Sequence, residues 1–513
     1  MKKILSVSLC VVAAMLMTMS CTDKNAKTAG VLEQVPASAD VVVVGNLKTI
    51  IESAGGSVDN SKIELPAYIS QTMTGQMMEE FGKANEILES AHVDLESCAV
   101  FADFDDETPV VVVTLKDQDC FVTAIQSLGY SKMEAGGDME LYSKEQTNDS
   151  YVAVNGSYAY VLPEVKAEPD FMPAEYLQNI AVKASDKSFA TTSFGKYISE
   201  GNAVGVSVAF NDKMQTMLQT FGMPLGAMNS YKGIVCVRGN LSSNKCVVEM
   251  SMFDEEGKEM KAEAMTPFMD NSSTVSKKAI ALLGEKEYVA YALSLKDVDW
   301  NKYLDMVSEA GGLSRSARAQ MNMVMNYLEN IDGTVAMGFG LTNGMESIAS
   351  MNRMGRDIMS QFSATMVIET KDGSAKKLLD DIKNLLEGFS VPFNESTSGL
   401  SVGLDMVGVP GTLYAECVGD FLVFANHEIK SDNDNIFVGK SEITDNRAAF
   451  YAELDKDNKL MRDLNLKDDV TLVGYTTPET MKGAVVFEID GDSKTGFIAK
   501  VVDMVSGMTV KGM

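Results

Sequence analysis

Two stretches far apart in this chain carry the same sequence patterns in the same order. In each, a short apolar run (41–44 and 289–292) leads into a helical pattern that ends at paired glycines. The helical patterns repeat their apolar residues three, four and seven positions after the first, which predicts one buried face on each helix. These residues are Leu47, Ile50, Ile51 and Ala54 in the first stretch and Trp300, Tyr303, Leu304 and Val307 in the second.

The correspondence continues along both stretches and predicts an internal duplication. One of the matched hairpins turns at Asn155-Gly156, a pair that tolerates the positive φ angles of a tight turn. The remaining matches are a strand with an amphipathic helix (110–128 and 365–382), a hairpin (151–162 and 414–425), a strand (205–210 and 449–454), and a Lys-Gly pair predicted to open a last hairpin (Lys232-Gly233 and Lys482-Gly483).

The duplication sets the expected domain organisation and fold class. We predict two tandem halves of one fold, residues 31–264 and 279–513, joined by a polar linker at 265–278. Predicted strands outnumber helices, and tight turns join many of them. The expected class is therefore α+β, with mostly antiparallel sheet and amphipathic helices packed on one face.

The first 21 residues read as an export signal. Two lysines precede an uncharged, mostly apolar run at 4–17, which is too short for a membrane-spanning helix. The run ends at Ser20-Cys21, which resembles a bacterial lipoprotein signal, although Thr18 stands where that pattern usually has leucine. The resemblance implies a signal peptide at 1–20, lipidation of Cys21 and a flexible tether at 21–30. The alternative is an ordinary cleaved signal that contains cysteines.

Charge and hydropathy limit the classes of partner that this chain can bind and the ways in which it can attach to a membrane. The net charge of −28 argues against nucleic acid or anionic lipid headgroups, which need clustered lysine and arginine. No later apolar run reaches the length of a membrane span. We therefore expect attachment to the membrane through lipid on Cys21 alone, where the several acyl chains of a lipoprotein, palmitate among them, hold more firmly than one.

Cysteines and histidines give little sign of a metal or redox site. After Cys21 the chain has an odd set of five cysteines without metal-ligand spacing: Cys98, Cys120, Cys236, Cys246 and Cys417. Cys236 and Cys246 flank a predicted hairpin turn, so a cross-strand disulfide and buried thiols both remain open. His92 and His427 each lack a second histidine nearby. We predict that both histidines are surface or hydrogen-bonded structural residues, and we predict no metal site and no cofactor.

Acidic turns at 432–435 and 455–457 resemble calcium-binding loops only in part. They lack the glycine at the sixth position and the glutamate at the twelfth that complete an EF-hand. We therefore interpret both segments as solvated turns.

Three short motifs allow an enzymatic alternative. Ser374-x-x-Lys377, Ser431-Asp-Asn and Lys494-Thr-Gly occur in the order found in penicillin-binding proteins and β-lactamases. The resemblance implies Ser374 as nucleophile, Lys377 as its activating partner, and Ser431 and Lys494 completing an envelope serine hydrolase.

The context of these motifs favours a non-enzymatic protein. Predicted strands, not helices, separate the first two motifs, and Lys494 falls in the predicted turn between strands 485–489 and 497–502. Ser374 stands where a helix N-cap is expected. Lys377 lies at the margin of an apolar face, where its ammonium reaches water.

The lipoprotein start, the segment Val35–Asp40 before a β run, and the duplication together resemble a known family. It is a family of uncharacterised Bacteroidetes lipoproteins with a domain of unknown function, and it implies no activity or site residues. We expect a lipid-anchored, non-enzymatic binding or scaffold protein with an unidentified protein or small-molecule partner. The expected location is the outer membrane, facing the periplasm.

Overall fold

The computed structural model describes residues 28–104, 108–133, 139–144, 150–163, 172–220, 231–309, 325, 327–344, 346–347, 358–405, 409–430, 434–492 and 495–512. Cys21 and the predicted signal peptide lie outside these residues. The chain forms two compact units. Unit 1 comprises Met1–Phe221, Lys232–Glu259 and Asp492–Val502, and unit 2 comprises Gly222–Tyr231, Met260–Gly491 and Asp503–Met513. Within the described residues, no helix has both the length and the apolar composition needed to cross a bilayer.

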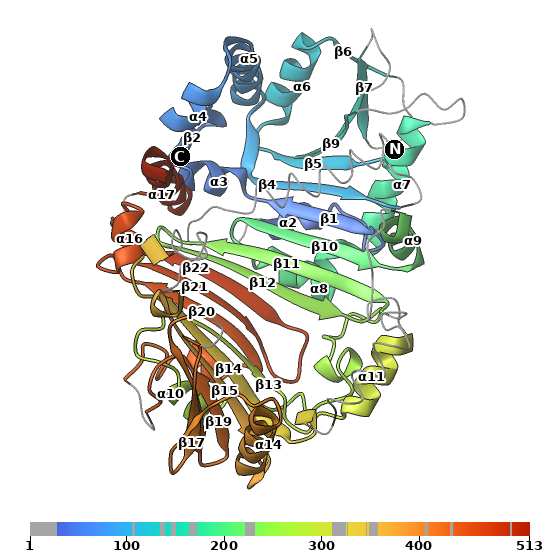
Figure 1. The fold of residues 1–513 in the computed structure, drawn as a ribbon. Coiled ribbons are helices and arrows are strands. Elements are labelled where there is room, and N and C mark those ends of the chain that lie inside the picture. Colours follow the sequence, from blue (N-terminus) through green and yellow to red (C-terminus); the bar gives the residue numbers. More distant parts are fainter. Residues whose placement is uncertain are drawn as a thin grey trace. The chain divides into compact units, whose positions relative to one another are not determined.

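Unit 1 contains a large antiparallel sheet (Figure 1). Its central strand β1 (Val41–Gly45) is short and rich in valine, which suits a strand buried between two neighbours. Neighbouring strands pair in the order β12 (Lys245–Phe253), β11 (Gly233–Leu241), β10 (Val204–Phe210), β1 (Val41–Gly45), β4 (Val93–Ala102), β5 (Val110–Leu115), β9 (Tyr158–Leu162), β8 (Tyr151–Asn155), β7 (Glu140–Lys144) and β6 (Tyr130–Lys132). A separate hairpin joins β2 (Ser57–Asp59) and β3 (Lys62–Glu64).

Helices cover both faces of this sheet, whereas the sequence predicted one covered face. Side chains alternate between the two faces along a strand, so neighbours on β9 contact different clusters. Tyr160 and Leu162 pack in one cluster with α2 (Thr28–Leu32), α7 (Pro173–Asp186) and α8 (Ser193–Ser199). Ala159 packs in the other with α5 (Gly75–Ala91) and α6 (Gln118–Ser127). The described residues of unit 1 also form α3 (Leu47–Ser53), α4 (Ala67–Thr72) and α9 (Asp212–Thr220).

Unit 2 contains a second antiparallel sheet. Its strands pair in the order β22 (Gly483–Ile489), β21 (Val470–Thr476), β20 (Ala448–Leu454), β13 (Val289–Ser294), β14 (Ile331–Leu341), β15 (Phe362–Thr370), β19 (Phe421–Ala425), β18 (Thr412–Val418), β17 (Gly399–Gly403) and β16 (Asn394–Glu395). Both faces are again covered. Val423 packs with α10 (Lys277–Ala281) and α15 (Ser441–Thr444), whereas Leu422 packs with α14 (Ser374–Gly388). The other helices that begin in unit 2 are α11 (Trp300–Glu309) and α16 (Lys459–Asp463).

The C-terminal segment is a helix, α17 (Phe497–Gly512), where the sequence predicted a strand at 497–502. Phe497 is fully buried and Lys500, one helical turn later, is almost fully buried, so one side of the helix faces the core. Lys500 donates to the side chain of Asn244, and the backbone N–H of Ile498 donates to the Ser53 hydroxyl at 3.4 Å. These contacts join residues 492–502 to the rest of unit 1.

The last predicted hairpin of the second half also differs from the structure. Gly483 does not open a further hairpin, because it begins β22, the second strand of the β21–β22 hairpin. The corresponding prediction at Gly233 is confirmed, since that residue begins β11, which pairs with β12.

Cys236 and Cys246 are free and buried, which answers the question left open by the sequence. Cys236 lies opposite Ser251 and Cys246 opposite Leu241, five positions further along the ladder. That offset is about 17 Å, well beyond the Cα separation that a disulfide bridges. Burial raises the pKa of Cys236 to about 12 and that of Cys246 to about 11, so both remain protonated thiols.

Candidate functional site

Unit 2 contains a pocket with a volume of about 430 Å³. It lies where four segments meet: the turn before β13, the residue after β14, the start of β15 with the short helix η4 (Ile358–Ser360), and the residues after β19. Phe362 and Met359 supply apolar lining, and Ser360, Ser363 and Asn426 supply polar groups. This mixture suits a small molecule that carries both apolar and hydrogen-bonding parts.

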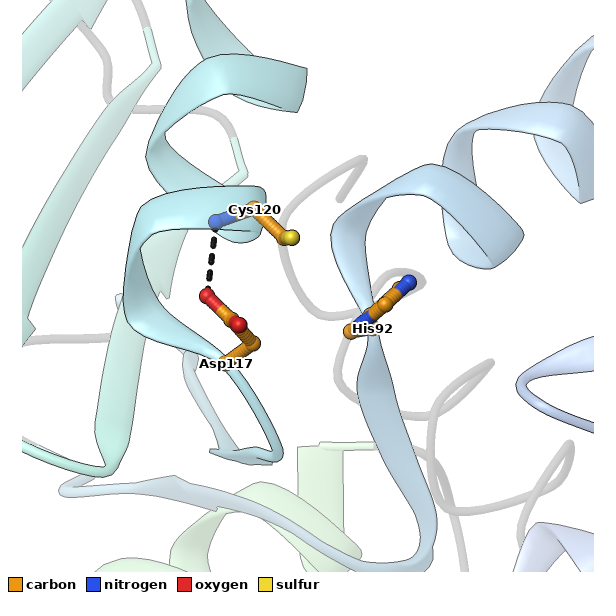
Figure 2. Close-up of side chains that lie close together, drawn as sticks. All are labelled: His92, Asp117 and Cys120. Atoms are coloured by element: carbon orange, nitrogen blue, oxygen red, sulfur yellow. Dashed lines mark hydrogen bonds between the residues drawn. The ribbon is translucent and has the colours of Figure 1, made fainter.

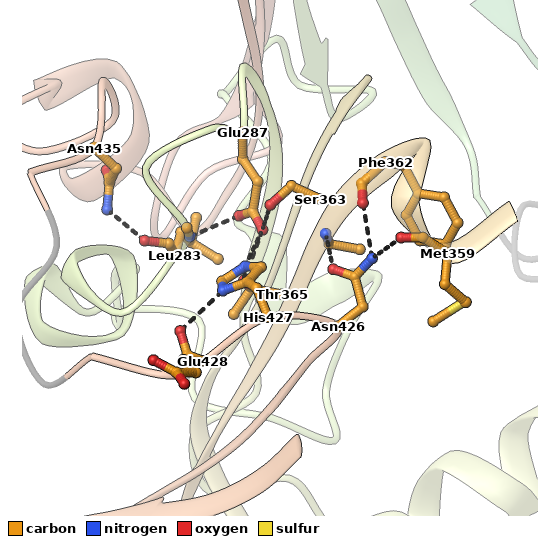
Figure 3. A network of polar contacts seen from close by, with 12 residues as sticks. Leu283, Glu287, Met359, Phe362, Ser363, Thr365, Asn426, His427, Glu428 and Asn435 are labelled. Atoms are coloured by element: carbon orange, nitrogen blue, oxygen red, sulfur yellow. Dashed lines mark hydrogen bonds and ion pairs between the residues drawn. The ribbon is translucent and has the colours of Figure 1, made fainter. Parts of the chain in front are cut away.

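A fully buried carboxyl group lies behind the pocket wall (Figure 3). Glu287 ends a turn that begins at Gly284, and it accepts a hydrogen bond from the Gly284 backbone N–H at 2.8 Å. The Thr365 hydroxyl donates to the same carboxyl group at 2.6 Å, and the Ser363 hydroxyl lies at 3.4 Å. Burial of a carboxyl group requires such partners, because none of its hydration remains.

His427 joins this carboxyl group to the pocket, which it helps to line. Its Nε2 lies 3.3 Å from Glu287 Oε1 and 3.1 Å from Thr365 Oγ1, and its Nδ1 lies 3.1 Å from the Glu428 carbonyl oxygen. The carbonyl and the carboxylate can only accept, so both ring nitrogens are best matched as donors. The hydrogen bond to Glu287 is the main cause that raises the pKa of His427.

The sheet pairing brings these residues together, and a glycine leaves room for them. Thr365 lies opposite Ala425 on β19, two residues before His427, and opposite Gly338 on β14. A Cβ at Gly338 would lie only 1.9 Å from Glu287 Oε2. The carboxyl group therefore occupies the space that a side chain on β14 would otherwise fill.

Two asparagines hold the surrounding loops. Asn426 donates to the carbonyl oxygens of Met359 and Phe362 at 3.0 and 2.8 Å, which fixes η4 against β19. Asn435 is buried and donates to two carbonyl oxygens, of Ile280 and Leu283, just where α10 ends. The sequence predicted a solvated turn at 432–435, and this is wrong for Asn435, because the helix end needs donors for its last carbonyls.

Charged side chains lie at the rim of the pocket. Lys430 forms an ion pair with Glu285 at 2.6 Å, and this lysine lowers the pKa of the Glu285 carboxyl group. Lys286 and Glu428 are exposed and also line the pocket. The rim thus offers groups of both signs to a ligand.

The residues of the predicted hydrolase are only partly described. Ser374 is the first residue of α14, and Gly373 with φ of 72° takes the N-cap position that the sequence assigned to Ser374. Glycine replaces serine there because the cap residue has a positive φ. Lys377 is exposed on the same helix, as expected. Ser431 and Lys494 lie outside the described residues.

Sequence reasoning predicted a structural role for His427 but missed its partner. Glu287 precedes it by 140 residues, and no local spacing connects the two. The segment Leu282–Tyr288 contains Glu285, Lys286 and Glu287 in a row, so its pattern does not mark Glu287 as the buried one. At 455–457, by contrast, the predicted solvated turn is confirmed, since all three residues are exposed.

Comparisons with known proteins give only distant structural similarity. Crystal forms III, IV and I of TP0453 each align with 43% of this chain at 13% sequence identity, covering 78%, 79% and 77% of that protein. The TM-scores are 0.28, 0.28 and 0.25, a likeness that carries no argument about function. No protein-family model and no curated protein matches the sequence.

Proposed function

We propose that this protein is a lipid-anchored, non-enzymatic binding protein of the cell envelope, and that the pocket of unit 2 holds a small polar ligand. The pocket is the observation that carries the proposal. Its volume of about 430 Å³ falls in the range of small-molecule sites, and its lining combines an aromatic ring with several hydrogen-bonding groups.

The polar network beside the pocket supports binding over catalysis. A general base needs a ring nitrogen or carboxylate that can reach the substrate. Both ring nitrogens of His427 already face acceptors within the protein, and the Glu287 side chain has no exposed surface. The network therefore stabilises one wall of the pocket and maintains the shape of the pocket.

The proposed cellular location rests on the sequence. An apolar run followed by Ser20-Cys21 supports lipidation of Cys21, and the resemblance to Bacteroidetes lipoproteins supports an outer-membrane location facing the periplasm. The acidic charge of the chain favours a partner other than nucleic acid.

We further propose that residues 31–264 and 279–513 are two copies of one fold. The strand order β12-β11-β10-β1-β4-β5-β9-β8-β7-β6 of unit 1 corresponds position by position to β22-β21-β20-β13-β14-β15-β19-β18-β17-β16 of unit 2. Both sheets also have a register shift at the same place, in β4–β5 and in β14–β15. Such irregularities are features of a fold that copies retain.

A screen of small polar molecules tests the binding role. Free amino acids, monosaccharides and nucleosides are added in turn to the purified chain, and thermal unfolding is followed. A molecule that binds the folded state raises the unfolding temperature. We expect Ser360→Trp, an exposed lining position, to abolish the rise by filling the pocket, and Ser441→Trp, exposed on α15, to retain it. A stabilising molecule whose effect survives Ser360→Trp would contradict the assignment of the pocket.

Replacement of Cys21 tests the membrane anchor. In Cys21→Ala the acceptor of the lipid is gone, so we expect either a soluble mature chain or an uncleaved precursor. Membrane fractionation and the mass of the N-terminal fragment are the measurements. Cys10→Ala is the matched control, because Cys10 lies in the predicted signal peptide and should be lost with it. Normal processing and membrane attachment of Cys21→Ala would rule out the anchor.

A further inference from the structure

The register of one hairpin in unit 1 brings the residue before β4 next to the residues after β5. Val93 at the start of β4 pairs with Leu115 at the end of β5. The ladder extends by one more hydrogen bond, from the Lys116 N–H to the His92 carbonyl oxygen at 3.0 Å. His92 ends α5 in a left-handed conformation with φ of 49°. Its ring therefore lies beside the segment that begins at residue 117.

The start of α6 adds two further side chains to this position. Asp117 is the N-cap of α6, and its carboxylate accepts a hydrogen bond from the Cys120 N–H at 2.9 Å. This cap fixes the first helical turn and sets the Cys120 thiol on the same side as the carboxylate. Figure 2 shows both side chains on the turn of α6 that faces His92.

The three side chains bring together three kinds of metal ligand. One ligand atom each from His92, Asp117 and Cys120 lies within 4.8 Å of the other two. A tetrahedral zinc site with bonds of about 2.0–2.3 Å has ligand atoms about 3.3–3.8 Å apart, so modest rotation of these side chains closes the set. His92 and Asp117 are exposed and Cys120 is half-buried, so a cation in solution can reach all three.

We propose that His92, Asp117 and Cys120 form a binding site for a thiophilic divalent cation, Zn²⁺ or a metal of similar preference. Imidazole, carboxylate and thiolate are the donors zinc takes in proteins, whereas Ca²⁺ and Mg²⁺ take oxygen. Three protein ligands at the surface leave the fourth position to water or to a ligand atom of a partner. This site is in unit 1 and does not depend on the pocket of unit 2.

The local electrostatics agree with a site for a cation. Partial burial and the neighbouring Asp117 carboxylate both raise the pKa of the Cys120 thiol, since a second anion beside the first is unfavourable. The Cys120 N–H and, to a smaller extent, His92 lower the pKa of Asp117, which is therefore ionised at neutral pH. A divalent cation relieves the repulsion between carboxylate and thiolate.

Sequence reasoning missed this site because it looked for a second histidine or for paired cysteines. The ligands instead come from the end of one helix and the first turn of another, connected by the β4–β5 hairpin. Two features of the sequence did point to this site. Asp117-x-x-Cys120 stands at the start of a helix, shortly after strand β5, and the strand that pairs with β5 directly follows His92.

Cobalt titration of the purified full-length chain tests the site. Co²⁺ replaces zinc in such sites and gives a sulfur-to-metal charge-transfer absorption only when a thiolate binds it. We expect this absorption to saturate at one equivalent, and added Zn²⁺ to remove it by displacement. Calorimetry with Zn²⁺ alone gives the affinity.

Three variants remove one ligand each and preserve the local backbone. Asparagine at position 117 still caps a helix, and asparagine at 92 tolerates the left-handed conformation, so Asp117→Asn and His92→Asn remove only the ligand. We expect both to weaken zinc binding by about tenfold or more. Cys120→Ser should abolish the charge-transfer absorption. The matched control is Cys417→Ser, which removes another free, half-buried thiol and should leave both signals unchanged.

Other results would overturn the proposal. If Cys120→Ser retains the charge-transfer absorption, the thiolate ligand is elsewhere. If all three ligand variants bind zinc as the unmodified chain does, the cation sits on the acidic surface and not at this site. Circular dichroism of each variant confirms that the fold is kept, so a lost signal reports lost ligands.

Discussion

Replacing Gly205 by alanine is expected to lower the free energy of unfolding of unit 1 by about 3 kcal/mol or more. Gly205 lies on β10 beneath α8, and a Cβ there would lie 2.3 Å from the carbonyl oxygen of Ile198 and 2.7 Å from its Cβ. Ile198 is fully buried, so the surrounding core leaves no space for it to move away from the added Cβ. The helix must move off the sheet, or the strand must shift, and either movement opens the core.

A neighbouring glycine gives the matched control for this prediction. Gly45 on β1 pairs with Val204, next to Gly205 in the same ladder. A Cβ at Gly45 would meet its nearest neighbour, the sulfur of Cys98, at 3.8 Å, which is ordinary contact. We therefore expect Gly45→Ala to leave stability nearly unchanged. Hydrogen exchange of the β10 and α8 amides measures the effect in unit 1, and equal exchange in both variants would contradict the close packing of α8 on β10.

Gly338→Ala is expected to destabilise unit 2 by about 3–5 kcal/mol. The added Cβ would lie 1.9 Å from Glu287 Oε2 and 2.8 Å from its Cδ. If the carboxyl group moves, it loses its hydrogen bonds from Gly284 and Thr365 while still buried, and breaking a buried charged network is among the costliest changes in a protein. If it stays, the strand β14 must distort.

The same substitution should change how stability depends on pH. The pKa of His427 is raised in the folded state, chiefly by its hydrogen bond to Glu287, although burial and, to a smaller extent, Lys286 oppose the shift. The folded state therefore holds a proton that the unfolded state has released. The contribution of His427 to the stability of unit 2 is then fully present below the ordinary histidine pKa and is lost as the pH rises through the raised value. Displacement of Glu287 removes the main cause, so this slope should flatten in Gly338→Ala.

The single tryptophan of the chain makes unit 2 straightforward to follow. Trp300 is in α11 of unit 2, so its fluorescence during urea unfolding reports on that unit. Gly474→Ala is the control, because a Cβ at Gly474 on β21 would have its nearest neighbours at 4.0 Å. A Gly338→Ala chain with the stability and pH slope of the control would show that Glu287 does not occupy the position described.

Local patterns in the sequence predicted most individual elements. The strand at 110–115 has the predicted bounds, and the segments at Leu47 and at Phe121 are both helices. Phe121 lies on a buried face as predicted, but the helix at Leu47 buries Thr49 and Ser53 where an apolar face was predicted. Segment 497–502 was assigned wrongly because a short apolar run fits a buried strand and a buried helix equally well. The covered faces were also wrong. Alternation shows that a strand has two sides, but not how many of them helices will cover.

The candidate sites could not be read from the sequence for a different reason. Each depends on residues brought together by strand pairing, Glu287 with His427 across β13–β14–β15–β19 and His92 with Asp117 across β4–β5. A register can be predicted only when both strands and their order in the sheet are known. Neither site has the short, fixed spacing of a recognised motif.

The contribution of residues 492–502 to unit 1 bears on how the chain acquires its structure. The buried Lys500 and Phe497 of α17 belong to a unit whose described strands all lie before residue 254, so the core of unit 1 stays incomplete until most of the chain has been synthesised. Likewise, one edge of strand β1 stays unpaired until β10 has been synthesised. Until then a row of valines with unpaired backbone groups is available to other chains. Folding intermediates of this protein should therefore need protection from aggregation, and slow synthesis would prolong that need rather than relieve it.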